Sequence, residues 1–257
     1  MKLRNGKRTM SFSEIISKNL VMVFDVETTG LLPKTVKDYR TPLHQQPYII
    51  QLSYIIYDTV SKIIVFRYNQ YIRIPENIKI PDIVLQITGI TNEKCAEQGI
   101  PIEDALISFY RDMHLCSRII AHNYHFDKTV LQTEFKRYMY LEHFRNSCPN
   151  APIVFDLRYL ECQKIRSTCT MAISTSICKI RHTHPKFAAF PNIYKWPKLS
   201  ELHQYLFGYV PENLHDANVD VEACLKCYLE LVNVVIPKYY EEKKEETLRM
   251  SLKNMVV

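Results

Sequence analysis

The sequence has no long hydrophobic run and no disulfide framework. No stretch approaches the roughly 18 consecutive apolar residues of a membrane-spanning helix. The chain begins with basic residues, but no apolar segment of the signal-peptide kind follows them. Eight cysteines are scattered without a framework spacing in a chain of 257 residues, which is too long to need disulfide staples. We therefore expect reduced thiols in a soluble, intracellular protein that does not bind membranes.

Internal repeats and low-complexity linkers are also absent, which predicts a single domain. Hydrophobic residues make up 47% of the chain, enough for a substantial core. Lys and Arg total 33 against 27 Asp and Glu, and this basic excess is compatible with a polyanionic partner. Around the domain we expect a basic N-terminal extension at 1–18, an insertion at 161–196 and a charged tail at 238–257.

One stretch near the start predicts a buried central strand. The apolar run 20–24 leads into Asp25 and Glu27 and is bounded by a turn signal at 28–30. Strand side chains alternate, so the two acids share one face. Two carboxylates at the end of a buried strand repel each other and lose hydration unless a cation lies between them. Such oxygen ligands favour Mg²⁺ or Mn²⁺. Because Asp-x-Glu also occurs by chance in unrelated proteins, the prediction of a metal site depends on further acids elsewhere in the chain.

Patterns elsewhere predict the elements around this strand. Two segments rich in Ile, Tyr and Val, 48–57 and 63–74, are separated by a turn signal and predict an antiparallel hairpin beside it. Short strands are predicted at 118–123 and 152–157. Helices are predicted at 81–86, at 101–115, at 125–140, from 199 to a glycine cap at Gly208, and from 217 onward. Between 161 and 196 no clear periodicity is present.

Two more acids lie in line with buried helical stripes. Asp127 stands one turn before Leu131 on the apolar face of the 125–140 helix. Asp220 stands three residues after Ala217 and borders the apolar stripe of the last helix. A purely structural residue at such positions would rarely be an ionised carboxylate.

A single site would explain all four acids. A cluster of Asp25, Glu27, Asp127 and Asp220 can hold two divalent cations about 3.5 to 4 Å apart, the arrangement that cleaves phosphodiesters. His215, five residues before Asp220, is then a candidate general base.

Three segments of the chain resemble the exonuclease motifs of the DnaQ-like 3'-5' exonucleases. These are F-D-V-E-T-T-G-L, H-N-Y-H-F-D and H-D-A-N-V-D, spread over about 20–235. The subclass that they resemble is DEDDh, because its histidine spacing is met by His215, whereas the tyrosine position of the sister subclass holds Asp216. The resemblance implies an RNase H-like α/β fold, with a mixed central sheet that contains an antiparallel hairpin and is flanked by helices.

The resemblance also implies roles for individual residues. Two Mg²⁺ ions, replaceable by Mn²⁺, would be ligated by the four acids Asp25, Glu27, Asp127 and Asp220, and His215 would deprotonate the attacking water. The substrate would be contacted by Thr28, Leu31, Thr88, Asn123 and Phe126. Leu31 would wedge against the terminal base. Thr88 stands where the family commonly has a histidine, so this contact departs from the family pattern.

The implied activity is metal-dependent 3'-5' hydrolysis of single-stranded or frayed DNA, with release of nucleoside 5'-monophosphates. One alternative is an exoribonuclease or oligoribonuclease of the same superfamily, because the catalytic groups address phosphate and not sugar. Another is a nucleic-acid-binding module without activity, against which the presence of all five catalytic residues argues.

The segment 161–196 raises two further hypotheses. Zinc binding is suggested by Cys162, Cys169, Cys178, His182 and His184, although no Cys-x2-Cys pair occurs among them. The basic residues are Lys164, Arg166, Lys179, Arg181 and Lys186, among Tyr194 and Trp196. They fit a nucleic-acid-facing lobe and a solvated surface equally well.

Overall fold

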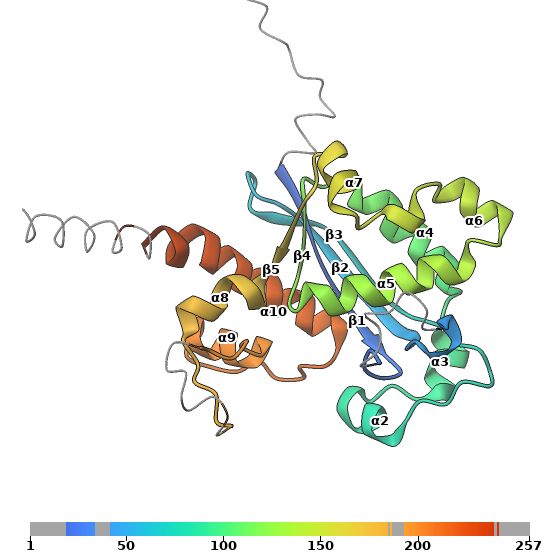
Figure 1. Cartoon of the computed structure of the whole chain (residues 1–257), viewed down its shortest axis with the longest axis horizontal. Helices are drawn as coiled ribbons and strands as arrows, with labels where there is room; N and C mark the ends of the chain where they lie inside the picture. Colours follow the sequence, from blue (N-terminus) through green and yellow to red (C-terminus); the bar gives the residue numbers. More distant parts are fainter. Residues whose placement is uncertain (1–18, 34–41, 185, 187–192, 239–240, 242–257) are drawn as a thin grey trace, which may run out of the picture.

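The computed structural model describes residues 19–33, 42–184, 186, 193–238 and 241. At its centre is a five-stranded sheet with the order β3-β2-β1-β4-β5 (Figure 1). The strands are β1 (Leu20–Thr28), β2 (Ile49–Asp58), β3 (Ile63–Tyr71), β4 (Arg118–Ala121) and β5 (Arg166–Cys169). The neighbours β1, β2 and β3 pair antiparallel, and β4 and β5 run parallel to β1. The predicted mixed sheet with its hairpin is confirmed. The expected basic extension 1–18 lies outside the described residues, as does nearly all of the tail.

Helices cover both faces of the sheet. They are α2 (Asp82–Thr88), α3 (Asn92–Gln98), α4 (Ile102–Met113), α5 (Tyr124–Tyr138), α6 (Glu142–Ser147), α7 (Leu157–Cys162), α8 (Thr170–Cys178), α9 (Leu199–Phe207) and α10 (Ala217–Glu230). Shorter helical turns are η1 (Leu43–Gln45), η2 (Ala151–Ile153) and η4 (Leu231–Val235). Gly208 caps α9 with φ 81°, as predicted, because glycine adopts this left-handed conformation without strain. Every helix among the described residues is too short or too polar to span a bilayer.

The alternation along β1 decides which layer each side chain enters. Phe24 belongs to the larger core, together with Phe109 of α4 and Phe135 of α5. Val23 belongs to the second core, with Val221 of α10. By the same alternation the acids of β1 lie on the face that α10 covers.

The last predicted strand is in the wrong place. At 152–157 the chain forms η2 and a turn, whose Val154 and Phe155 are buried in the larger core. The fifth strand is instead β5, within the segment that showed no periodicity, and α8 follows it directly. A short apolar run does not distinguish a strand from another buried segment. The strand β5 pairs on one side only, with β4, so its sequence Arg-Ser-Thr-Cys needs no apolar alternation.

Candidate active site

Asp25 and Glu27 lie on β1 beyond the end of its pairing with β4. The parallel pairs stop at Val23↔Ile120, whereas β1 continues to Thr28 and remains paired with β2 to that point. The two acids are therefore held by the pairing of β1 with β2. On the other edge β4 no longer pairs with β1 beside them, so the chain that follows β4 can approach this edge.

Asp127 fills this open edge from the first turn of α5. Asn123 reverses the chain there with φ 62° and ψ 45°, a left-handed conformation that asparagine tolerates better than most residues. The Asp127 side chain is only 2% exposed, and its Oδ1 accepts a hydrogen bond of 3.2 Å from the backbone N–H of Val26. Val26 separates the two acids of β1 in sequence. The bond thus places the third carboxylate against the strand that carries the first two.

Asp220 and His215 come from the start of α10. Asp216 caps this helix, because its carboxylate accepts a hydrogen bond of 2.9 Å from the N–H of Asn218. His215 has φ 77°, a left-handed conformation that is uncommon for a residue other than glycine. Its backbone N–H donates to Oδ2 of Asp220 at 3.1 Å. This bond links the candidate base to the fourth acid.

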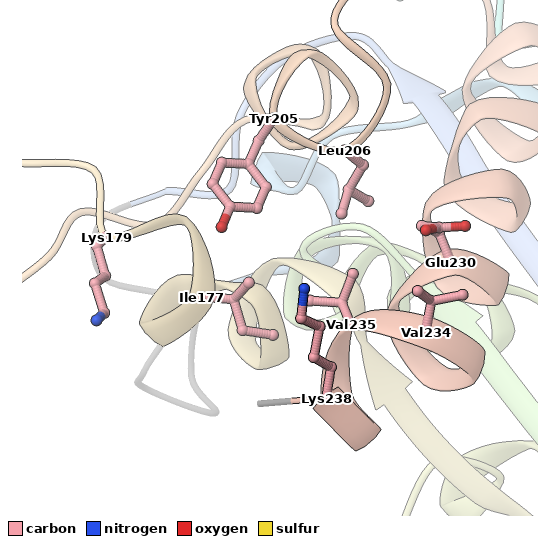
Figure 2. A pocket seen from close by; sticks show the side chains of 8 residues that line it. All are labelled: Ile177, Lys179, Tyr205, Leu206, Glu230, Val234, Val235 and Lys238. Atoms are coloured by element: carbon pink, nitrogen blue, oxygen red, sulfur yellow. The ribbon is translucent and has the colours of Figure 1, made fainter. Parts of the chain in front are cut away.

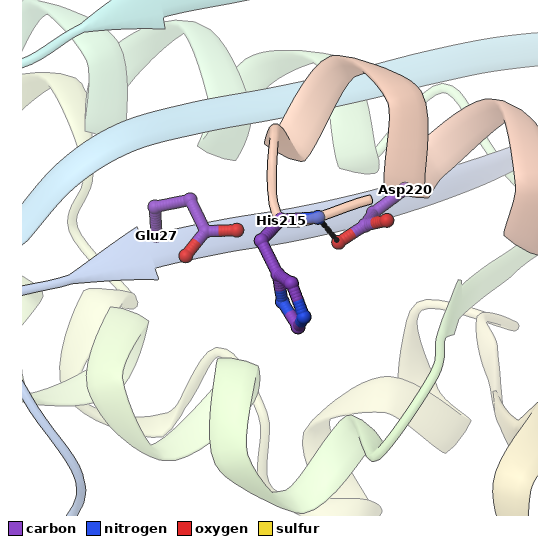
Figure 3. A group of neighbouring side chains, drawn as sticks. All are labelled: Glu27, His215 and Asp220. Carbon is purple, nitrogen blue, oxygen red and sulfur yellow. Dashed lines mark hydrogen bonds between the residues drawn. The ribbon is translucent and has the colours of Figure 1, made fainter. Parts of the chain in front are cut away.

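The structure brings Glu27, His215 and Asp220 together from two ends of the chain. One potential ligand atom of each lies within 4.8 Å of the others. Figure 3 shows the imidazole of His215 between the carboxylates of β1 and α10. In the part of the chain that the structure describes, no other group of three or more His, Cys, Asp or Glu side chains meets this criterion.

The pKa values of all four carboxylates of the site are raised. Burial, followed by repulsion from the other acids, raises the pKa of Asp25 well above its usual range. The same causes raise the pKa of Glu27 to about 8. Burial raises the pKa of Asp127 to about 8 although the hydrogen bond from Val26 opposes the shift. Burial also raises the pKa of Asp220, to about 6.

These residues fit a divalent cation. The charged groups that shift the four pKa values are all acids, so among the residues that the structure describes no lysine or arginine is found to offset the cluster. Oδ1 of Asp220 is buried and, among the described residues, has no hydrogen-bond partner. An unpaired buried carboxylate oxygen is costly unless a cation binds it. Hard oxygen ligands of this kind suit Mg²⁺ or Mn²⁺.

The raised pKa values predict that the metal-free protein loses stability as the pH rises. For Glu27, Asp127 and Asp220 the folded-state pKa lies above the unfolded value near 4, so the folded state binds more protons between about pH 4 and pH 8. In EDTA we expect a lower Tm at pH 8 than at pH 5.5, and a larger gain from Mg²⁺ at pH 8. Thermal melts followed by circular dichroism will measure these differences in Tm. A change of 1 kcal/mol in the free energy of unfolding shifts the Tm of such a domain by about 2 to 4 °C.

Asp127→Asn is the matched control for this experiment. The variant keeps an oxygen acceptor for Val26 but cannot ionise, so its Tm in EDTA should fall less between the two pH values. If the Tm of the two proteins in EDTA depended equally on pH, the effect would not originate in the acid cluster.

The predicted apolar substrate contacts differ in exposure. Leu31, in the turn after β1, is 85% exposed. Phe126, directly before Asp127, is partly buried and packs on the larger core. Asn123 is the N-cap residue of α5. Leu31 thus lies shortly after Glu27 in the sequence, and Phe126 directly precedes Asp127.

The two predicted threonine contacts make local hydrogen bonds. Thr28 Oγ1 donates to the carbonyl of Gly30 at 2.7 Å. Thr88 Oγ1 donates to the carbonyl of Val84 at 2.9 Å and accepts from the N–H of Ile90 at 3.1 Å. Each hydroxyl thus shapes its own turn in this structure.

Gln51, a buried residue of β2 that is 1% exposed, was not predicted from the sequence to belong to the site. Its Oε1 accepts a hydrogen bond from the N–H of Ala217 at 3.2 Å, and its Nε2 donates to Oδ1 of Asp216 at 3.0 Å. Gln51 thereby attaches the start of α10 to the sheet. Asp220 lies in the first turn of this helix, and His215 directly precedes its N-cap residue. The signal available in the sequence was an amide within the apolar run of β2.

The zinc hypothesis gains no support from the described residues. The one group of potential metal ligands found there contains no residue of 161–196. All eight cysteines are unpaired, as expected for reduced thiols.

A cavity of about 470 Å³ lies apart from the acids (Figure 2). Its apolar lining comes from α8, α9 and the turn after α10, and comprises Ile177, Leu206, Val234 and Val235. Glu230, which also lines it, is ten residues after Asp220 on one helix, or about 15 Å at 1.5 Å per residue. The chemistry suggested by the acids is therefore separate from this cavity.

Comparison with known proteins agrees with the motifs and the fold. The model of the family described as Exonuclease (RNase_T) matches residues 22–228. The zinc-bound form of an Escherichia coli exonuclease I complex with single-stranded DNA is similar in structure, with a TM-score of 0.59 and 17% identity over 88% of this chain and 42% of that chain. An E. coli exonuclease I complex with a dT13 oligonucleotide gives a TM-score of 0.59 and 15% identity over 87% and 43% of the two chains. The chain thus spans about two fifths of these exonuclease I chains. Comparison with curated protein sequences gives no match.

Proposed function

Because this chain belongs to the exonuclease family, whose model covers residues 22–228, we propose that it is a metal-dependent 3'-5' exonuclease of the DEDDh type. Its substrate is a single-stranded or frayed nucleic acid, preferably DNA, and its products are nucleoside 5'-monophosphates. The observation that carries the proposal is the meeting of Glu27, Asp220 and His215 beside the half-buried Asp25 and the buried Asp127. We further propose that the catalytic unit is a single domain with additions at 1–18 and at the tail 238–257. The predicted insertion 161–196 narrows to the chain after α8, because β5 belongs to the central sheet.

The four acids would hold two divalent cations, Mg²⁺ or Mn²⁺. When bound, such ions supply positive charge that activates a water molecule and stabilises the leaving oxygen. In this mechanism His215 accepts the proton of the water that attacks the terminal phosphodiester. The bond from phosphorus to the 3' oxygen of the preceding nucleotide breaks, and a nucleoside 5'-monophosphate leaves. The hydrogen bond from the His215 backbone to Asp220 holds this residue beside the acids.

The apolar contacts support a single-stranded end as the substrate. Leu31 and Phe126 offer no hydrogen-bonding groups with which to read a base edge, but they can hold an unstacked terminal base. Sequence preference should therefore be weak. The oligonucleotides in the E. coli exonuclease I complexes are single strands, which is consistent with this proposal.

A labelling experiment tests the activity and its direction. Matched DNA and RNA strands labelled at the 3' or the 5' end would be incubated with Mg²⁺ and the products separated. We expect a labelled mononucleotide at once from the 3'-labelled strand and a ladder of shortened strands from the 5'-labelled one, faster with DNA. Release of mononucleotides first from the 5' end would overturn the proposed direction, and faster cleavage of RNA would overturn the DNA preference.

We predict that paired ends are degraded more slowly than single strands. Opening one terminal base pair costs about 1.4 kcal/mol of stacking, which corresponds to about a tenfold lower rate for each pair that must fray. Initial rates on a single strand, a mismatched 3' end and a blunt duplex should fall in that order. Higher salt should slow all three, because contacts with the phosphate backbone are electrostatic. Equal rates on the three substrates, or cleavage of a circular single strand, would contradict the end-binding role of Leu31 and Phe126.

A further inference from the structure

The only tryptophan of the chain lies on the surface. Trp196 is 68% exposed, although tryptophan side chains are on average well buried. The backbone around Trp196 is held in place by contacts with the segment that follows α8. Arg181 and Tyr194 form an antiparallel bridge, and the guanidinium of Arg181 lies 5.5 Å from the centre of the Tyr194 ring. The N–H of Lys195 donates to the carbonyl of Ile180 at 2.9 Å. The exposed indole is therefore carried by a well-defined piece of backbone.

A half-buried histidine attaches this piece of backbone to the end of the sheet that carries the acids. Nε2 of His122 lies 2.9 Å from the carbonyl oxygen of Pro197, and its Nδ1 lies 2.9 Å from Oγ1 of Thr170. Since a carbonyl only accepts, Nε2 carries the hydrogen and Nδ1 accepts from the hydroxyl of Thr170. Burial lowers the pKa of His122 to about 4, so the neutral imidazole that these bonds need is present at physiological pH.

The strand register places His122 at the end of the sheet that carries the acids. Val23 of β1 pairs with Ile120 of β4, and His122 follows the last residue of β4, so it lies at the end of the sheet toward which β1 continues to Asp25. The carbonyl bonded by His122 belongs to the residue directly after Trp196. The backbone beside Trp196 is thus attached at the same end of the sheet as the acid cluster.

The charge of the segment that carries Trp196 fits a polyanion as its ligand. Between residues 179 and 201 the chain has five basic residues and one acid. They are Lys179, Arg181, Lys186, Lys195 and Lys198 against Glu201. Lys195 forms an ion pair with that acid, and the segment keeps a net positive charge. An exposed aromatic face among basic residues is the arrangement with which proteins bind single-stranded nucleic acid.

We propose that Trp196 stacks on a base of the substrate strand, several nucleotides before its 3' end, while the basic residues around it hold the phosphates. This inference rests on the proposed function and adds to it a second contact with the strand. It explains why an indole is kept in solvent at this position. It predicts that the enzyme binds long single strands more tightly than short ones.

Because Trp196 is the only tryptophan, intrinsic fluorescence reports on this position alone. Full-length Asp25→Asn protein, which should not degrade DNA, would be titrated with a labelled oligothymidylate of twelve nucleotides. We expect saturable quenching of the tryptophan emission at the concentrations at which fluorescence anisotropy shows binding. Binding by anisotropy without any quenching would overturn the proposal.

Kinetics of variants of the otherwise wild-type enzyme provide the second test. Trp196→Ala should raise the KM for the long strand about 5- to 150-fold, which corresponds to the stacking of one base, and Trp196→Phe should raise it less. The rise should be smaller for a dinucleotide. The control is Tyr140→Ala, which removes another exposed ring, 72% exposed, after the end of α5, and should leave the KM unchanged.

Two outcomes separate this inference from the proposed function. If the wild-type enzyme degrades the strand but Trp196→Ala has the KM of Tyr140→Ala, only the role of Trp196 is wrong. If the wild-type enzyme neither binds nor degrades single strands, the proposed function fails and this inference fails with it.

Discussion

Replacing Asp25 by alanine is expected to abolish Mg²⁺-dependent cleavage while leaving the protein folded. Loss of a group that stabilises the transition state lowers kcat by about 10²- to 10³-fold, and loss of a metal ligand should cost at least as much. Asp220→Ala should have the same effect on activity. Initial rates of release from a single strand at saturating Mg²⁺ will measure both.

The same substitutions should not destabilise the metal-free protein. Asp25 is half-buried, and desolvation followed by repulsion from the neighbouring acids raises its pKa, so its removal relieves both. The Tm of the Asp25→Ala protein in EDTA at pH 8 should equal or exceed that of the wild type. Asp220 also accepts the N–H of His215, so Asp220→Asn, which keeps an oxygen acceptor, is the better variant for the stability measurement.

Glu222→Ala is the matched control for these variants. Glu222 lies two residues after Asp220 on the same helix, but it is exposed and pairs with Arg67 at the surface. Its loss should leave cleavage near the wild-type rate. If purified Asp25→Ala retains appreciable Mg²⁺-dependent activity while Glu222→Ala behaves as expected, the assignment of the acids to a two-metal site is wrong.

Replacing His215 by alanine should lower kcat about 10²- to 10⁴-fold, the usual contribution of a general base. The imidazole accepts a proton only when it is neutral, so the wild-type rate should fall toward acid pH. Acid also weakens metal binding by the carboxylates. Both proteins should therefore be measured at saturating Mn²⁺ over a range of pH, where the wild type should lose more activity in acid than His215→Ala.

His143→Ala controls for the general effect of removing an imidazole. His143 is exposed on α6, and its side chain is not part of the proposed site. This variant should keep the rate and the pH profile of the wild type. A His215→Ala enzyme with the same rate and the same acid profile as His143→Ala would remove His215 from the mechanism.

Several parts of the fold follow directly from local sequence patterns. The strand β1, the hairpin of β2 and β3, and the start of α10 were predicted from the period of their apolar residues, and all three are confirmed. These elements bury a regular stripe or face, which leaves a periodic signal. The strand β5 left no such signal, because an edge strand of four residues packs on one neighbour only and can be polar. The apolar run at 152–157 was misleading because burial alone does not specify a strand.

The candidate acids could be named from sequence because each is a carboxylate at a position where burial makes it unfavourable. Their mutual arrangement required the tertiary structure. Asp127 bonds to the backbone of Val26 at a separation of 101 residues. Gln51 attaches α10 to the sheet over 165 residues, so that His215 reaches the acids of β1. Contacts of this kind depend on how helices pack on the sheet, and a local pattern carries no information about which distant backbone group a side chain will meet.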